Sequence, residues 1–207
     1  INGAVGGTRI DVHQKGGDIY NNITTRVTNA KLTHGIRGAF WYQGENNQGS
    51  DGPDPDYDYK FYTQYFVDMT ASWKTDFPNL RNYYVFQIWP AACSMGPMGD
   101  QLRDVQRRLI TMYSHLKEMS ILGVVPEVGC HTPRAGYLRI GQLITPLVKE
   151  DIYGLTGTTN SAANLRQAYF TTTNLNQIVL TFDQSMAWNV LATSMFFLDN
   201  VAGKVAS

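Results

Sequence analysis

Three polar clusters in this sequence could take part in acid–base or nucleophilic chemistry, and each follows a short apolar run. They are Gly6-Gly7, the pentapeptide Gln43-Gly44-Glu45-Asn46-Asn47, and the segment from Glu127 to His131. Glycine N–H groups and amide side chains can stabilise an oxyanion. A carboxylate can orient a histidine, which then takes a proton from a nucleophile. If the three clusters meet, they supply the groups that acyl transfer needs.

The elements that precede and follow these clusters are expected to bring them together. Apolar runs bounded by glycine, proline or polar residues predict strands at 1–5, 39–42, 82–90 and 120–125. Apolar residues that recur every three or four positions predict helices at 22–32, 59–76, 98–119 and 136–150. This alternation predicts an α/β fold with a parallel sheet covered by helices on both faces. Ligands of such sheets bind at the carboxyl ends of the strands, where the polar clusters lie.

The pattern changes after Tyr153. Residues 156–164 are small and polar, and strand-like runs follow at 168–171, 177–182 and 195–198 without helices between them. Consecutive strands predict an antiparallel module. We therefore expect an α/β domain at 1–154, and a linker with the start of a β-sandwich-like module at 155–207. The chain starts inside a strand-like pattern and stops before the module could close, so we expect it to be part of a longer polypeptide.

Composition excludes some partners. The 207 residues carry 17 Lys and Arg against 17 Asp and Glu, and the basic residues are scattered. Nucleic-acid binding needs clustered positive charge, so no nucleic-acid partner is expected. No apolar run approaches the roughly 18 residues of a membrane span, so no membrane partner is expected either. Cys, His and carboxylate residues show no metal-ligand spacing, and neither a metal nor a cofactor is predicted.

Four stretches together resemble the SGNH hydrolases, and within them the sialate O-acetylesterase and acetylxylan-esterase-like branch. They are INGAVGGTRI at the start, IRGAFWYQGENN, the LRDVQRRL helix, and a histidine on a loop before a helix. The resemblance spans residues 1 to about 150 and implies a flavodoxin-like sheet. By this resemblance Gly6 or Gly7 is the oxyanion glycine and His131, with Pro133 two residues on, is the catalytic histidine. Gln43, Gly44, Glu45 and Asn46 form the oxyanion and substrate block.

The sequence departs from the branch in three respects. The acid before the histidine is Glu127 at a spacing of four, rather than an aspartate at two or three, and Asn46 replaces a serine. The nucleophile block that precedes Gly-Gly-Thr in the family does not occur. The string Asp183-Gln184-Ser185-Met186 leaves a circular permutation open, with Ser185 as nucleophile. The same string also fits a strand and turn of a β-sandwich module, and another chain of an assembly could supply the nucleophile.

Two further alternatives stay open. Cys93 and Cys130 follow consecutive strands and form either a disulfide at the rim of the site or two reduced thiols. Trp41, Tyr42 and Trp89 belong to the core or stack against a sugar.

The resemblance implies a parent protein that removes acetyl groups from sugars or polysaccharides such as sialate or xylan, through a serine nucleophile. Its partners would be an acetylated carbohydrate and the remaining segments of the polypeptide or another copy of the chain. A secreted or periplasmic location would suit such an enzyme. The alternative is a catalytically inactive carbohydrate-binding or structural protein of the same fold.

Overall fold

The computed structural model describes residues 1–49, 59–90, 92–94, 96–122, 124, 131–156 and 163–187. It divides into two compact units, Ile1–Ala162 and Ala163–Ser207. Each unit is considered by itself below.

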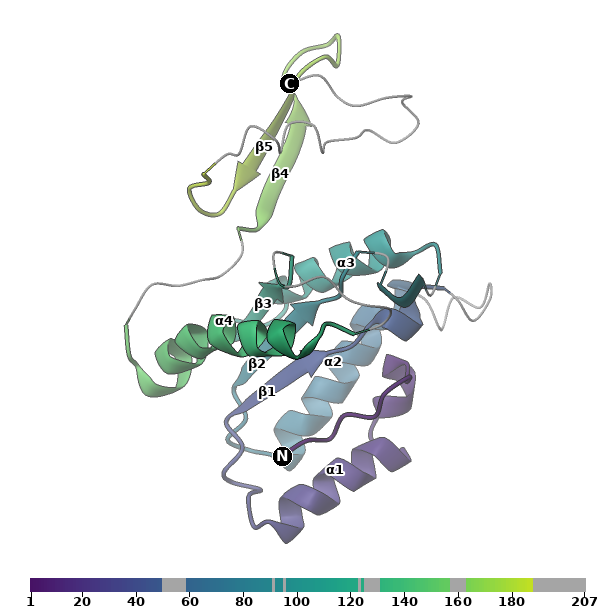
Figure 1. Cartoon of the computed structure of the whole chain (residues 1–207), viewed down its shortest axis with the longest axis vertical. Helices are drawn as coiled ribbons and strands as arrows, with labels where there is room; N and C mark the ends of the chain where they lie inside the picture. Colours follow the sequence, from purple (N-terminus) through teal and green to yellow (C-terminus); the bar gives the residue numbers. More distant parts are fainter. Residues whose placement is uncertain are drawn as a thin grey trace. The chain divides into compact units, whose positions relative to one another are not determined.

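The first unit is built on a three-stranded parallel sheet in the order β1-β2-β3 (Figure 1). The strands are β1 (Gly38–Tyr42), β2 (Asn82–Gln87) and β3 (Leu116–Ser120). The register pairs Phe40 with Tyr84 and Val85 with Glu118. The α-helices are α1 (Asp18–Asn29), α2 (Tyr59–Asp76), α3 (Gly99–Arg108) and α4 (Arg134–Tyr153). Short 3₁₀ helices occur at Ile10–His13, Glu45–Asn47, Ala92–Ser94 and Leu109–Thr111.

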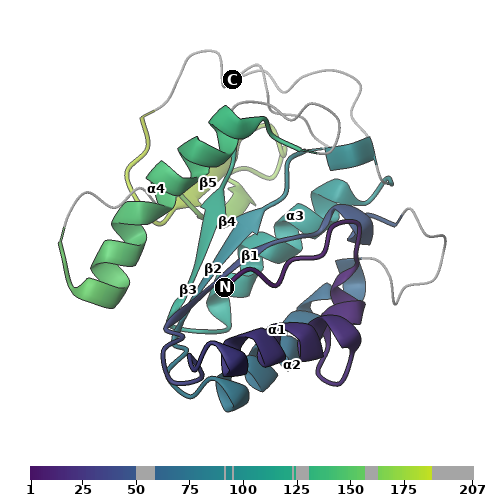
Figure 2. The same ribbon diagram turned by 60° about the horizontal axis from the view of Figure 1, so that its bottom comes forward.

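Helices cover both faces of this sheet, as Figure 2 shows for α4 on one side and α1 and α2 on the other. Alternation along β2 sends Tyr83 and Val85 into one core cluster and Tyr84 and Phe86 into the other. The first cluster includes Tyr62 and Phe66 of α2 and Leu102 of α3, whereas Ile140, Ile144 and Leu147 of α4 form part of the second. The expected α/β fold class is confirmed.

The second unit contains an antiparallel pair, β4 (Leu165–Phe170) and β5 (Ile178–Phe182). This is the start of the antiparallel module that the sequence predicts. Tyr169, Phe170 and Leu175 are exposed in it. The strand predicted at 195–198 lies outside the described residues.

Two predicted boundaries are wrong. The helix expected at 98–119 ends at Arg108, and the strand expected at 120–125 begins at Leu116 instead. The spacing of Leu109, Met112 and Leu116 suits a helix, but Leu116 and Met119 pack into opposite core clusters, as alternating strand residues do. His115, expected on that helix, lies in the turn that leads into β3.

The strand predicted at 1–5 is also absent. Residues 1–5 adopt no regular secondary structure, although they lead into a turn at Gly6-Gly7 as expected. A strand exists only where its backbone pairs with a neighbour, and no described strand pairs with this segment. None of the described helices has the length and apolar character that a membrane span requires.

Candidate active site

The loop after β1 has a backbone that only glycine fits. Gly44 has φ 151°, a value that L side chains rarely adopt. A Cβ atom there would come within 2.8 Å of Ile88 Cγ2 and 2.9 Å of Gln106 Nε2. Gly44 therefore lets the chain turn closely over β2 and α3, directly into the short helix Glu45–Asn47.

The side chain of Gln43 joins this loop to the Gly6-Gly7 turn. Its Nε2 donates to the carbonyl oxygen of Thr8 (3.1 Å) and to Asn47 Oδ1 (2.8 Å). Asn47 Oδ1 also accepts the backbone N–H of Ile10 at 3.0 Å. The structure thus brings two of the three predicted clusters together. Because both N–H bonds of its amide are used, Gln43 acts here as a positioning residue rather than as an oxyanion donor.

Asn46 lies across the same junction but is differently placed. Its Nδ2 is 3.4 Å from the carbonyl oxygen of Gly7, a long contact that leaves its amide available to a ligand. Gly7 has φ 69° and, like Gly6, is exposed, with open space where a side chain would be. The two exposed glycines and the half-buried Asn46 are the groups of the junction that a ligand could reach.

A buried network that the sequence did not reveal supports the backbone of Gln43. The carbonyl oxygen of Gln43 accepts the Tyr62 hydroxyl (3.0 Å) and Gln106 Nε2 (2.8 Å). Trp41 Nε1 donates to the Tyr62 oxygen at 3.0 Å. Gln106 Oε1 accepts the N–H of Ile88 at 2.9 Å, so one side chain joins the ends of β1 and β2. Gln106 follows Leu102 by one helical turn, and a polar residue in an apolar stripe was the available signal.

His13 supports the Gly6-Gly7 turn through the side chain of Thr8. The Thr8 hydroxyl donates to the carbonyl oxygen of Val5 (2.7 Å) and lies 2.8 Å from His13 Nε2. The His13 ring meets the Trp41 ring edge-on, with centroids 5.1 Å apart. Burial lowers the pKa of His13, which Asp11 partly opposes. The neutral ring that results suits a structural role.

Gln48 ties the junction to the segment after β2. It is fully buried, and its Nε2 donates to the carbonyl oxygens of Glu45 (2.9 Å) and Ala92 (2.7 Å). Cys93, the next residue after Ala92, is disulfide-bonded. Of the two alternatives for Cys93, the disulfide is therefore the one observed. Cys130, the other cysteine of the chain, lies outside the described residues.

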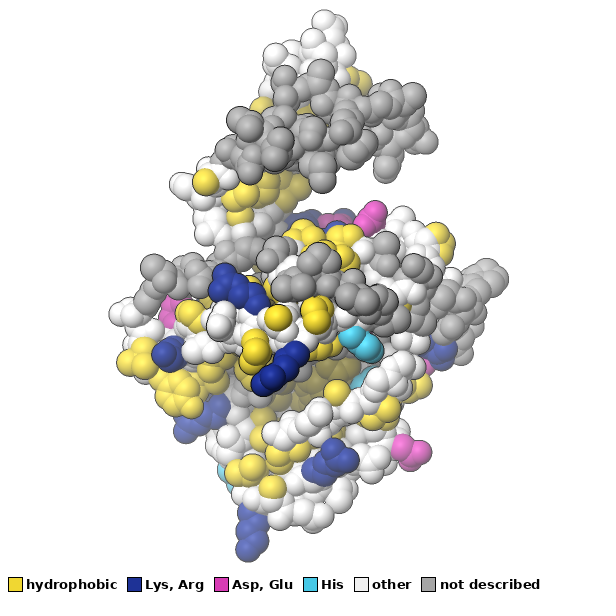
Figure 3. Space-filling view, in the orientation of Figure 1, with side chains coloured by type: hydrophobic (Ala, Val, Ile, Leu, Met, Phe, Trp, Pro, Cys, Tyr) yellow, Lys and Arg dark blue, Asp and Glu magenta, His cyan; other side chains and the backbone are white. Residues whose placement is uncertain are grey.

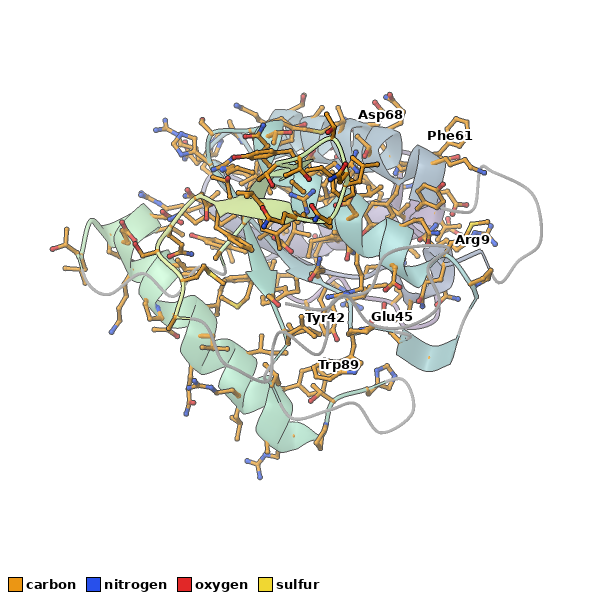
Figure 4. All side chains as sticks on the ribbon, turned by 90° about the horizontal axis from the view of Figure 1, so that it is seen from above. Arg9, Tyr42, Glu45, Phe61, Asp68 and Trp89 are labelled. Carbon is orange, nitrogen blue, oxygen red and sulfur yellow. The ribbon has the colours of Figure 1, made fainter. Side chains whose placement is uncertain are left out.

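Aromatic residues flank the carboxyl ends of β1 and β2. Trp41 is buried in the first core cluster, which assigns it to the core. Tyr42 and Trp89 are half-buried and pack against both clusters. Figure 4 shows Tyr42, Glu45 and Trp89 in the same part of the view, where these strands end.

The third predicted cluster is described only in part. Glu127 lies outside the described residues. His131 is exposed and stands three residues before Arg134, the first residue of α4. Within the described part of the chain no hydrogen bond joins His131 to Gln43, Asn46 or the Gly6-Gly7 turn, so its role stays a prediction.

Ser185 belongs to the second unit. It is exposed, three residues after the end of β5, and no helix follows it among the described residues. The permuted nucleophile likewise stays a prediction. Within the described part of the chain, no group of three or more His, Cys, Asp or Glu side chains is arranged to hold a metal ion.

Known proteins resemble the chain in sequence over its first part and in fold over most of it. Residues 1–88 match the family model described as carbohydrate esterase, sialic acid-specific acetylesterase. No curated protein matches the chain. The crystal structure of a carbohydrate acetylesterase from Xanthomonas citri aligns with a TM-score of 0.57 at 20% identity, covering 70% of this chain and 32% of that protein. The chain thus spans about a third of the length of that protein.

The matched residues include both the Gly6-Gly7 turn and the loop from Gln43 to Asn47, the two clusters that the structure joins. The match over residues 1–88 therefore supports the resemblance to the SGNH carbohydrate esterase branch that the motifs indicate.

Proposed function

We propose that the protein to which this chain belongs is a carbohydrate O-acetylesterase. The observation that carries this proposal is the junction of Gly6-Gly7 with Gln43–Asn47 at the carboxyl end of β1, within the residues that match an acetylesterase family. The substrate would be an O-acetylated sugar, with O-acetyl sialic acid tested before acetylated xylan because the family model is sialic acid-specific.

The reaction would proceed by acyl transfer to a serine. The serine oxygen attacks the acetyl carbonyl while His131 takes the hydroxyl proton, and the oxyanion is held by the Gly7 N–H and the Asn46 amide. His131 then protonates the departing sugar oxygen, and water hydrolyses the acetyl-enzyme to release acetate. Glu127 would orient His131. The serine would come from polypeptide outside this chain, with Ser185 as the alternative.

The test is acetate release by the full-length protein from O-acetyl sialic acid, acetylated xylan and 4-nitrophenyl acetate. His131→Ala should lower kcat by about 10²–10⁴-fold, since it removes the general base. His115→Ala, an exposed histidine in the turn before β3, is the matched control and should leave kcat unchanged. Equal activity of the two variants would contradict the proposal.

A fluorophosphonate probe identifies the nucleophile. An adduct on a serine outside residues 1–207 is the expected result, and an adduct on Ser185 would favour the permutation. If the intact protein binds acetylated sugars but forms no adduct and releases no acetate, it is a carbohydrate-binding protein and not an esterase.

A secreted or periplasmic location is part of the proposal. The disulfide at Cys93 supports it, because disulfides persist in oxidising compartments. Fractionation of cells that produce the full-length protein tests the location, and recovery in the cytoplasm alone would contradict it.

A further inference from the structure

Two arginines lie side by side at the amino ends of β1 and β2. Arg37 directly precedes β1 and Arg81 directly precedes β2. The carbonyl oxygen of Arg37 accepts the backbone N–H groups of Arg81 (3.2 Å) and Asn82 (3.3 Å). The candidate active site lies at the opposite ends of these strands, roughly 16 Å away for five residues at about 3.3 Å each. The two arginines therefore belong to a different part of the molecule.

A small pocket lies between these strand ends and the last turn of α4. Its volume is about 290 Å³. Its lining consists of Arg37, Asn79, Arg81, Asn82, Asp151 and Ile152. Figure 3 shows Lys and Arg side chains on the side of the first unit where α4 ends and β1 begins in Figure 1. Sites for small molecules occupy about 300–1,000 Å³, and Ile152 is the one apolar side chain of this lining. The pocket therefore suits a small hydrophilic ligand.

The guanidinium groups of Arg37 and Arg81 have no counter-ion within the described part of the chain. Arg107 shows the usual arrangement, since its Nη2 lies 2.7 Å from Asp104 Oδ1. Neither Arg37 nor Arg81 makes such a side-chain ion pair or hydrogen bond with a described residue, although both line the pocket. Each guanidinium presents a planar fork of N–H donors that matches an oxyanion. Because two like charges in one pocket repel each other, an anion held by both stabilises the pair.

The carboxylate of the lining is already paired. Asp151 Oδ1 lies 2.8 Å from Lys117 Nζ, and Asp151 Oδ2 accepts the Tyr84 hydroxyl at 3.1 Å. Lys117 thus balances the charge of Asp151. The pocket keeps the positive charges of Arg37 and Arg81, which favour an anionic ligand over a neutral one.

Two asparagine amides add uncharged donors. Asn79 Nδ2 donates one N–H to the carbonyl oxygen of His34 at 2.7 Å, which leaves its second N–H for a ligand. Asn82 Nδ2 is 3.5 Å from the carbonyl oxygen of Arg37, a contact too long to occupy the amide. Two guanidinium forks and two amides give the pocket the donors that the oxygen atoms of a phosphate, sulfate or carboxylate group accept from.

We infer that this pocket binds the oxyanion group of a small hydrophilic molecule, either a free phosphate or sulfate or the carboxylate of an acidic sugar. Arg37 and Arg81 hold the charged oxygen atoms through charge-assisted hydrogen bonds, and Asn79 donates a further one. The site is separate from the candidate active site, and it does not depend on the proposed esterase activity.

Isothermal titration calorimetry of the full-length protein at constant ionic strength tests the inference. The ligands are sodium phosphate, sodium sulfate and the methyl glycoside of N-acetylneuraminic acid, and at least one should bind saturably with a Kd below about 1 mM. Arg37→Gln and Arg81→Gln should each raise this Kd by about 10- to 100-fold, since each removes charge-assisted hydrogen bonds. Arg139→Gln, exposed on α4 outside the pocket, removes the same charge and should leave the Kd unchanged.

The variants should fold like the parent, because Arg37 and Arg81 use only backbone atoms in their hydrogen bonds to described residues. Urea unfolding checks this. Phosphate and sulfate that bind better than the glycoside assign the pocket to a free inorganic anion, and the reverse order assigns it to an acidic sugar.

Two results would overturn the inference. One is the absence of saturable binding of all three anions in the millimolar range. The other is an equal loss of affinity in Arg139→Gln and in the two pocket variants, since general attraction to positive charge would then explain the binding. An inactive protein that still binds an anion through Arg37 and Arg81 would refute the esterase proposal and retain this site.

Discussion

At the scale of single residues, two adjacent asparagines have opposite roles. Asn47 is fully buried and accepts hydrogen bonds from Ile10 and Gln43, whereas Asn46 is half-buried and has only a long contact with Gly7. Asn46→Ala should lower kcat by about 10²–10³-fold, as loss of an oxyanion donor does, with little change in stability. Asn47→Ala should lower the free energy of unfolding by about 1–3 kcal/mol, because it leaves buried donors unpaired.

The measurements are steady-state acetate release and urea unfolding of the two variants in the full-length protein. If Asn46→Ala unfolds the protein as readily as Asn47→Ala and leaves kcat unchanged, Asn46 is structural. A fall in kcat without a shift in the urea midpoint is the expected result.

Gly44 and Gly141 form a second contrast at this scale. Gly44→Ala should lower the free energy of unfolding by about 1–3 kcal/mol, since φ 151° strains an L residue and the new Cβ meets Ile88. Gly141 lies exposed in α4 with nothing within 4 Å of a Cβ. Gly141→Ala should raise the free energy of unfolding by about 0.5–1 kcal/mol, because alanine loses less backbone entropy than glycine in a helix. Calorimetry checks both signs, and a stabilising Gly44→Ala would contradict this account of the loop.

At the scale of elements, sequence periodicity predicts most of the first unit. The strand at 39–42 and the helix from Tyr59 lie where expected, because apolar runs and fourfold spacing are local signals. The sequence misplaces β3 because Lys117 and Glu118 occupy half-buried positions in it, which leaves too few apolar residues to show alternation. The segment 1–5 shows the other limit, since a strand depends on a partner that local sequence does not describe.

Substitution of Gln106 tests how α3 supports the carboxyl ends of β1 and β2. Its amide joins the carbonyl oxygen of Gln43 to the N–H of Ile88. Gln106→Leu leaves the buried Ile88 N–H unpaired, and the Gln43 carbonyl oxygen keeps only its hydrogen bond from the Tyr62 hydroxyl. We expect a loss of about 1–3 kcal/mol in the free energy of unfolding. Gln101→Leu, on the exposed face of the same helix, should stay within about 0.5 kcal/mol of the parent. Equal effects of the two substitutions in urea unfolding would show that the amide is not a support.

At the scale of the whole molecule, the sequence motifs predict which segments form the candidate site, but not the role of each side chain in it. The Gly6-Gly7 turn and the loop after β1 do meet, since both follow apolar runs that enter the same side of the fold. That Gln43 holds the two together, rather than binding an oxyanion, depends on distances that no spacing in the sequence encodes. Tyr62 and His13 also support the junction. The sequence pattern places Tyr62 on a helix that packs into the core and His13 in a connecting segment, so neither is predicted to lie near the site.

The electrostatics of the fold lead to a pH dependence of its stability. Burial raises the pKa of Glu118, on β3, to about 7, against the opposing charges of Arg107 and Arg103. The folded protein therefore retains a proton that the unfolded chain releases near pH 4.5. As pH rises from 4.5 to 7 the unfolded state binds fewer protons than the folded state, so the free energy of unfolding falls.

Ionisation of the half-buried Glu118 lowers the free energy of unfolding by on the order of 3 kcal/mol. This loss is fully present above pH 7 and disappears below pH 4.5. Glu118→Gln removes the titration and should be more stable than the parent at pH 8 but similar to it near pH 4.5. Glu150→Gln, in the last turn of α4, controls for the loss of one negative charge. Urea unfolding between pH 4.5 and 8 distinguishes them, because only Glu118→Gln should flatten the dependence on pH; a parallel curve would show that Glu118 ionises freely in the folded protein.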